Sequence, residues 1–174
     1  YIPVGHERSL WENAQQLELP YVLGRLKSIF ADPTLAKVAH NANYDMTVLG
    51  NPDVGMSVNN LTVDTMVAAH LLNEKSLSLK DLVSSRFDIP MTPITDLIGK
   101  GKKKITMSQV EIYKASAYAC ADADMTYRLS ESMAPELLET ELLQKLFADV
   151  EMPLVPVLVD MERNGIALDT GLLR

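Results

Sequence analysis

The sequence predicts an α/β fold in which short parallel strands alternate with helices. Two apolar runs, Lys37–Ala39 and Leu61–Val63, are too short for helices and read as buried strands. Each is followed by helical spacing of apolar residues, over Tyr44–Leu49 and over Asp64–Leu72. Successive strand–helix units of this kind pair their strands in parallel. A long pattern from about Ser108 to Ser132, without internal Pro or Gly, adds a helix-rich C-terminal part.

The N-terminal part is expected to begin with a strand and continue into a helix. Tyr1–Val4 is a short apolar run ended by Gly5, which is typical of a strand. Glu7–Gln16 is polar and uneven, and predicts a loop with one helical turn. In Pro20–Phe30 large apolar residues recur at three-to-four spacing, and proline suits a first helical turn.

The later elements are expected to be helices separated by proline and glycine. Met91–Met107 is the least regular stretch, and Pro135 should end the long helix. Further helices are predicted over Leu77–Phe87, Glu136–Asp149 and Pro153–Arg163.

Composition excludes several classes of protein. With 174 residues, 47% hydrophobic and 22% charged, the chain is long enough for a domain with a core and is not typical of a disordered protein. No apolar run approaches the roughly 18 residues of a membrane span. The single Cys120 excludes an internal disulfide. The net charge of −7 argues against nucleic-acid binding by bulk electrostatics, yet it is compatible with a nuclease whose metal-binding centre is acidic.

Tyr118 and Asp122 form the first candidate site. They lie four residues apart in the long helical pattern and should share one face, flanked by alanines. A carboxylate there can hold a metal ion, and the phenol can orient a water. The alternative is an ordinary helix with a surface Asp and a half-buried Tyr.

Asn41 and Asp45 form the second candidate, where a buried strand passes into a helix. Asn41 could instead be only an N-cap, and Asp64 at the next strand end is interpreted as an N-cap. His40 and His70 are interpreted as packed or surface histidines.

Two further patterns bear on phosphate chemistry. Two carboxylates, each with a polar companion four residues earlier, suit a two-metal site with ions about 4 Å apart. Such a site normally needs four carboxylates, and only two good candidates are found. The basic stretch Gly99–Lys104 is either a solvated loop or a phosphate-contacting loop, and its glycine spacing fits neither a P-loop nor a dinucleotide fingerprint.

These residues resemble the proofreading 3′–5′ exonuclease domain of bacterial family A DNA polymerases, over nearly the whole chain. Asn41, Tyr44 and Asp45 match the family's Asn-x-x-(Tyr/Phe)-Asp motif, and Tyr118 and Asp122 match its Tyr-x-x-x-Asp motif. The run from Glu151 to Ile166 resembles the opening of the polymerase domain, which ribonuclease D-like nucleases lack.

The resemblance implies a ribonuclease H-like 3′–5′ exonuclease fold that is truncated at the N-terminus. The family's first motif, an Asp-x-Glu on the first strand, has no counterpart, so we expect the first two strands to be missing. Residues 1–146 would be a partial exonuclease domain, and residues 147–174 the beginning of the polymerase domain. The open sheet edge left by the missing strand could support non-native association.

The resemblance also implies roles for individual residues. Asp122 would bind the tighter of two Mg²⁺ or Mn²⁺ ions and Asp45 the second, while Tyr118 would orient the attacking hydroxide. The substrate would be the single-stranded 3′ end of DNA, and the residues expected to contact it are Asn41, Tyr44, Lys100 and Lys102. The parent would be a polymerase of the bacterial cytoplasm, associated with the nucleoid.

Three readings of the activity remain open at this point. The first is a proofreading module of a DNA polymerase, inactive as this fragment because the Asp-x-Glu motif is absent; the sequence leaves open whether the fragment binds a metal ion. The second is a ribonuclease D-like RNA 3′ exonuclease. The third is a catalytically silent structural module.

Overall fold

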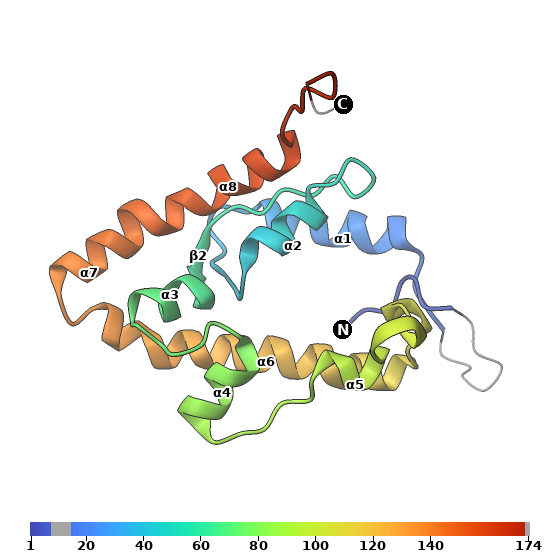
Figure 1. The fold of residues 1–174 in the computed structure, drawn as a ribbon, viewed down its shortest axis with the longest axis horizontal. Helices are drawn as coiled ribbons and strands as arrows, with labels where there is room; N and C mark the ends of the chain where they lie inside the picture. Colours follow the sequence, from blue (N-terminus) through green and yellow to red (C-terminus); the bar gives the residue numbers. More distant parts are fainter. Residues whose placement is uncertain (8–14, 173–174) are drawn as a thin grey trace.

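A small parallel sheet lies between two long helices in the computed structural model, which describes residues 1–7 and 15–172. Helix α6 (Ile112–Leu137) contacts strand β1 (Lys37–Ala39), and helix α8 (Met152–Asn164) contacts strand β2 (Leu61–Asp64), as Figure 1 shows. The strands pair in parallel, with Val38 opposite Val63 and Ala39 opposite Asp64. The strands predicted at Lys37–Ala39 and Leu61–Val63, and their parallel pairing, are therefore confirmed.

Shorter helices connect and cover this framework. The helices predicted over 20–30, 44–49, 64–72 and 77–87 are confirmed to within two residues at each end. One further short helix and two 3₁₀ turns lie between residues 91 and 110, where irregular structure was expected. The elements are α1 (Leu19–Ala31), α2 (Ala42–Leu49), α3 (Thr65–Leu71), α4 (Leu79–Phe87), α5 (Ile94–Ile98), η1 (Gly101–Lys103), η2 (Met107–Gln109) and α7 (Glu141–Lys145). No helix of the described chain is long and apolar enough to cross a membrane.

The main core joins α3, α4 and α6. Leu82, Leu129 and Met133 are almost completely buried in it. Arg86 on α4 reinforces this contact, because its guanidinium lies 2.6 Å from the carboxylates of both Glu74 and Glu136. These packed and charged contacts fix α6 relative to α3 and α4.

The prediction of a strand at Tyr1–Val4 is wrong. The segment pairs with neither strand and lies near η2 and the N-terminal part of α6 instead. Its main ties are the Glu7 N–H, which donates to the Ser108 carbonyl at 2.8 Å, and His6 Nδ1, which lies 2.9 Å from the Val110 carbonyl oxygen. An apolar run becomes a strand only where a neighbouring strand can accept its backbone hydrogen bonds. The predicted loop and turn over Glu7–Gln16 lie largely outside the described residues, which omit 8–14.

The expected break at Pro135 is also wrong. Helix α6 begins at Ile112, not Ser108, and continues through Pro135 to Leu137. Proline removes one helical hydrogen bond, but here it lies in the last turn, where Leu137 is buried in the core and offsets that loss. The next helix therefore starts only at Glu141, where the Thr140 side chain accepts a hydrogen bond from the Leu143 N–H.

The last two helices form one continuous helical run. A π-helical stretch, Leu146–Glu151, joins α7 to α8, and the Met152 N–H donates to the Phe147 carbonyl five residues earlier. The stretch directly precedes Pro153, which interrupts the ordinary ladder of hydrogen bonds. At the predicted helix start near Pro153, the structure therefore has a change from π-helical to α-helical geometry within one continuous run.

A buried carboxylate links the sheet to two helices. Asp64, the last residue of β2, is 2% exposed and accepts hydrogen bonds from three backbone N–H groups. The donors are Asn41 at 3.0 Å and Ala42 at 2.7 Å, where α2 begins, and Met66 at 2.8 Å in α3. The predicted role of Asp64 as the N-cap of α3 is confirmed. Its bonds to the first residues of α2 give it a second role, which is to hold the start of that helix.

We predict that Asp64→Ala lowers the free energy of unfolding by about 2–4 kcal/mol, because three N–H groups lose a charged acceptor. Urea denaturation followed by circular dichroism measures this change. Asp53→Ala, which alters an exposed acidic residue in a turn, is the control and should change stability by less than about 0.5 kcal/mol. Equal effects of the two substitutions would refute the structural role of Asp64.

Candidate functional site

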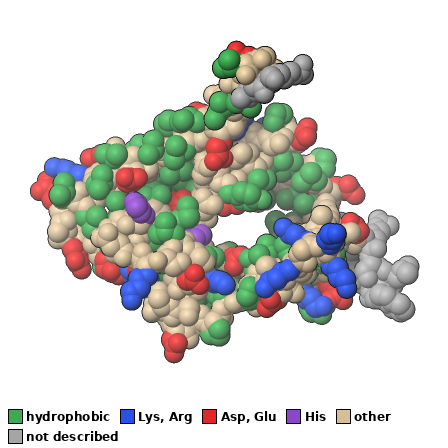
Figure 2. Space-filling model, in the orientation of Figure 1, with side chains coloured by type: hydrophobic (Ala, Val, Ile, Leu, Met, Phe, Trp, Pro, Cys, Tyr) green, Lys and Arg blue, Asp and Glu red, His purple; other side chains and the backbone are tan. Residues whose placement is uncertain are grey.

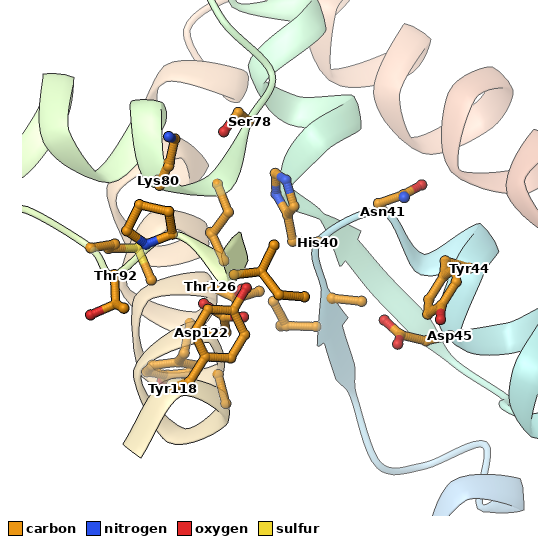
Figure 3. A pocket seen from close by; sticks show the side chains of 18 of the residues that line it. His40, Asn41, Tyr44, Asp45, Ser78, Lys80, Thr92, Tyr118, Asp122 and Thr126 are labelled. Atoms are coloured by element: carbon orange, nitrogen blue, oxygen red, sulfur yellow. The ribbon is translucent and has the colours of Figure 1, made fainter. Parts of the chain in front are cut away.

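A cavity of about 960 Å³ lies between α2 and α6. Its walls also include the end of β1, the start of α4 and residues 91–95 (Figure 3). Five of the residues predicted from the sequence line it together: Asn41, Tyr44, Asp45, Tyr118 and Asp122. The fold therefore brings the two candidate sites, far apart in the sequence, into one cleft.

The α2 wall presents Asn41, Tyr44 and Asp45. Asn41 has left-handed backbone dihedrals (φ 61°, ψ 54°), which asparagine tolerates better than most residues, and it occupies the N-cap position. Its side chain makes no capping hydrogen bond, because Asp64 accepts from the backbone instead. The amide group of Asn41 is therefore not occupied by a cap, contrary to the cap-only interpretation. Tyr44 is 67% exposed beside it.

The electrostatics of Asp45 are set by its place in the concave wall. The carboxylate is accessible to solvent, yet the surrounding protein desolvates it, and this raises its pKa. The negative charge of nearby Asp64 raises the pKa further. A cation bound in the cleft would relieve both effects.

The α6 wall presents Tyr118 and Asp122 one helical turn apart (Figure 3). Burial raises the pKa of Tyr118, and so do the negative charge of Asp122 and the hydrogen bond between them. Burial also raises the pKa of Asp122, while that same hydrogen bond partly lowers it. At neutral pH the phenol of Tyr118 therefore keeps its proton and can donate a hydrogen bond to the carboxylate of Asp122.

The predicted basic contacts lie elsewhere. Lys100 and Lys102 are exposed and do not line the cleft. They belong to a turn after α5 in which Gly99 and Gly101 adopt positive φ angles of 78° and 63°. Figure 2 shows lysine and arginine side chains gathered beside the hollow in the molecular surface.

Polar groups that the motif search missed also line the cleft. They include Ser78 and Lys80 at the start of α4, Thr92, and Thr126 one turn beyond Asp122. The four-residue spacing from Asp122 could have revealed Thr126. Lys80 could not be found this way, because only the packing of α4 against α6 brings it to the cleft.

The histidines fit the interpretation as packed or surface residues. His40 Nδ1 lies 2.9 Å from the Thr65 hydroxyl, and burial lowers the pKa of the imidazole. His70 is exposed on α3.

The two carboxylates of the cleft are hard oxygen donors of the kind that Mg²⁺ and Mn²⁺ prefer. Magnesium sites commonly use one or two protein carboxylates together with water and substrate phosphate. Within residues 1–7 and 15–172, no group of three or more His, Cys, Asp or Glu side chains could hold a metal ion. Asp45 and Asp122 each offer one carboxylate to a divalent ion in the cleft, which is at most a partial set of ligands.

Comparison with known proteins assigns the chain to a family. A family model described as 3′–5′ exonuclease, of the DNA polymerase A type, matches residues 7–138. The match covers more than half of the chain. The chain belongs to this 3′–5′ exonuclease family.

Relatives of this exonuclease-family chain are named DNA polymerase I. That of Chloroflexus aurantiacus is 42% identical over 176 residues, covering 100% of this chain and 18% of the relative. That of Pseudomonas aeruginosa is 37% identical over 182 residues, covering 99% and 19%. The chain thus spans about a fifth of the length of these curated relatives.

A solved structure shares the fold. It is described as the POL domain of Pol1 from M. smegmatis in complex with DNA primer-template and dNTP. The TM-score is 0.68 at 24% identity, over 93% of this chain and 24% of that one. The matches to DNA polymerase I do not favour the ribonuclease D-like alternative.

We predict that Asp122→Asn raises the melting temperature at neutral pH by about 1–3 °C. A raised carboxylate pKa means that the folded chain holds the proton more tightly than the unfolded chain, so stability falls as pH rises through that pKa. The neutral amide of Asp122→Asn avoids this loss of stability at neutral pH, and its oxygen can still accept a hydrogen bond from the Tyr118 hydroxyl. Below the unfolded pKa of about 3.9 the gain should vanish.

Thermal unfolding of wild type and variant, recorded at about pH 3 and about pH 7.5, measures the effect. Asp124→Asn, two residues along the same helix, removes an exposed ion pair with Arg128 and should give no gain. A melting temperature of Asp122→Asn at or below that of Asp124→Asn at neutral pH would contradict the desolvation of Asp122.

Proposed function

We propose that this chain is part of a DNA-directed DNA polymerase, DNA polymerase I, and belongs to its 3′–5′ exonuclease module. In the intact polymerase this module removes the 3′-terminal nucleotide for proofreading in DNA replication and repair, whereas the chain alone is inactive. One observation carries the proposal. In a chain of the 3′–5′ exonuclease family, Asp45 and Asp122 face a single cleft from different elements, and Tyr118 lines the same cleft one helical turn before Asp122.

The mechanism follows from the chemistry of these side chains. Asp45 and Asp122 would hold divalent ions, two in the intact parent, and such ions stabilise charge on the attacking and leaving oxygens of a phosphodiester. Tyr118, protonated at neutral pH, donates to Asp122 and orients the water that attacks the phosphorus. The free amide of Asn41 and the exposed ring of Tyr44 bind the terminal nucleotide, the ring by stacking on the base.

The proposal extends to fold type, boundaries and partners. The fold is assigned to the ribonuclease H-like class, with residues 1–146 in the exonuclease domain and residues 147–174 opening the polymerase domain. The partners are the single-stranded 3′ end of DNA, reached also by Lys100 and Lys102, and the rest of the polymerase. The structurally similar M. smegmatis POL domain, solved with a DNA primer-template, supports DNA as a partner. The parent is placed with the nucleoid in the bacterial cytoplasm.

A second candidate is a catalytically silent structural module. It is favoured by one observation, namely that Asp45 and Asp122 have no third metal-ligating neighbour among the described residues. Such a module would keep the cleft but bind no divalent ion at these positions.

We predict that Asp45→Asn in the parent polymerase lowers the rate of 3′-nucleotide removal by about 100-fold or more, because one metal carboxylate is lost. The assay uses a labelled single-stranded oligonucleotide with Mg²⁺ and records polymerase activity in parallel, which should be unchanged. Asp53→Asn is the control. Unchanged exonuclease activity in the Asp45→Asn parent would refute the proposal.

The same assay applied to this chain alone should show no metal-dependent turnover, because the two carboxylates form only a partial set of ligands. Turnover by the chain that is lost in Asp122→Ala would show that its own residues suffice.

A further inference from the structure

Lys80 is a cation on the cleft wall that the proposed mechanism does not use. It lies in the first turn of α4, directly after Ser78 and Leu79, and all three residues line the cleft. Figure 3 shows Lys80 and Ser78 together, on the side of the cleft away from Asp45. Of the described residues that line the cleft, Lys80 is the one lysine or arginine.

The ammonium group of Lys80 has no acidic partner within the described chain. Ion pairs engage Arg86, Lys114, Arg128 and Lys145, but none engages Lys80. Its sequence neighbour Asp81 accepts a hydrogen bond from the Ser76 hydroxyl at 2.9 Å instead. Lys80 is exposed, so its charge is available to a ligand in the cleft.

The neighbours of Lys80 favour an anionic ligand with several oxygens. The Ser78 side chain makes no capping hydrogen bond, so its hydroxyl can donate into the cleft. The other charged groups lining the cleft are the carboxylates Asp45 and Asp122, which would repel a phosphate. Lys80 lies across the cleft from Asp45 and on the same side as Asp122 (Figure 3), so its positive charge offsets their repulsion and lets a polyanion enter. Lysine with hydroxyl donors is a common set of contacts to a nucleic-acid backbone.

We propose that Lys80, assisted by Ser78, binds a backbone phosphate of single-stranded DNA in the cleft, next to the terminal phosphodiester. This inference rests on the proposed function and deepens it. Lys80 therefore acts at the reacting end of the strand. Lys100 and Lys102 lie outside the cleft lining, and in this proposal they contact the same strand outside the cleft.

The test measures the salt dependence of DNA binding by this chain. The probe is a fluorescein-labelled oligothymidylate of about four nucleotides, short enough to lie within one binding site. Fluorescence anisotropy gives the binding constant between about 50 and 200 mM NaCl, in EDTA to prevent hydrolysis. Each phosphate contact on a single strand contributes about 0.7 to the slope of log K against log salt concentration.

Lys80→Gln is expected to weaken binding about three- to tenfold and to lower the slope by about 0.7. Lys80→Arg should keep the slope, because the charge remains. Lys75→Gln is the matched control: it removes the same charge from an exposed position five residues earlier that does not line the cleft.

Two results would overturn the inference, and only the second would also overturn DNA as the substrate. If wild type binds the probe but Lys80→Gln and Lys75→Gln have the same affinity and slope, the role of Lys80 is refuted and the proposed exonuclease function stands. If wild type does not bind the probe, both the role of Lys80 and DNA as the substrate are refuted.

Discussion

The buried carboxylate of Asp64 is the interaction on which the cleft depends. It ends β2, caps α3 through the Met66 N–H, and accepts from the N–H groups of Asn41 and Ala42 where α2 begins. Because Asp64 is 2% exposed, these charge-assisted bonds lie in a low-dielectric interior and are strengthened by it. They fix the start of α2, and with it the side chains of Asn41 and Asp45. The same charge raises the pKa of Asp45, so one group both positions and tunes the site.

The opposite wall is positioned by apolar packing. Leu129 and Met133 hold α6 in the core, and Arg86 joins α4 to α6 through Glu136. Tyr118 and Asp122 lie beyond this packed part of the helix, half-buried beside the cleft. The site thus combines two independently fixed walls, and desolvation beside the cleft raises the pKa of both carboxylates. Perturbed carboxylates of this kind are common at functional sites.

The spacing of residues along the sequence was sufficient to predict features that depend on a single helix. The pairs Asn41/Asp45 and Tyr118/Asp122 each lie on a single helix face, so a four-residue period was sufficient to identify them. The predictions that failed concern features that are set by contacts between different helices and strands. Tyr1–Val4 has the composition of a strand but no strand beside it, and α6 passes Pro135 because Leu137 is buried in the core. Lys80 reaches the cleft only through tertiary packing, which no periodicity within α4 reveals.

The central claim is that Asp45 on α2 and Asp122 on α6 form one metal-binding site. The most direct measurement is a titration of the isotope-labelled chain with Mn²⁺, followed by the paramagnetic broadening of its backbone amide NMR signals. The account predicts that the signals around Asp45 and around Asp122 broaden together at the same low Mn²⁺ concentration, and that either Asp45→Asn or Asp122→Asn weakens the broadening at both walls. Broadening at neither wall, or at one wall independently of the other carboxylate, would contradict it.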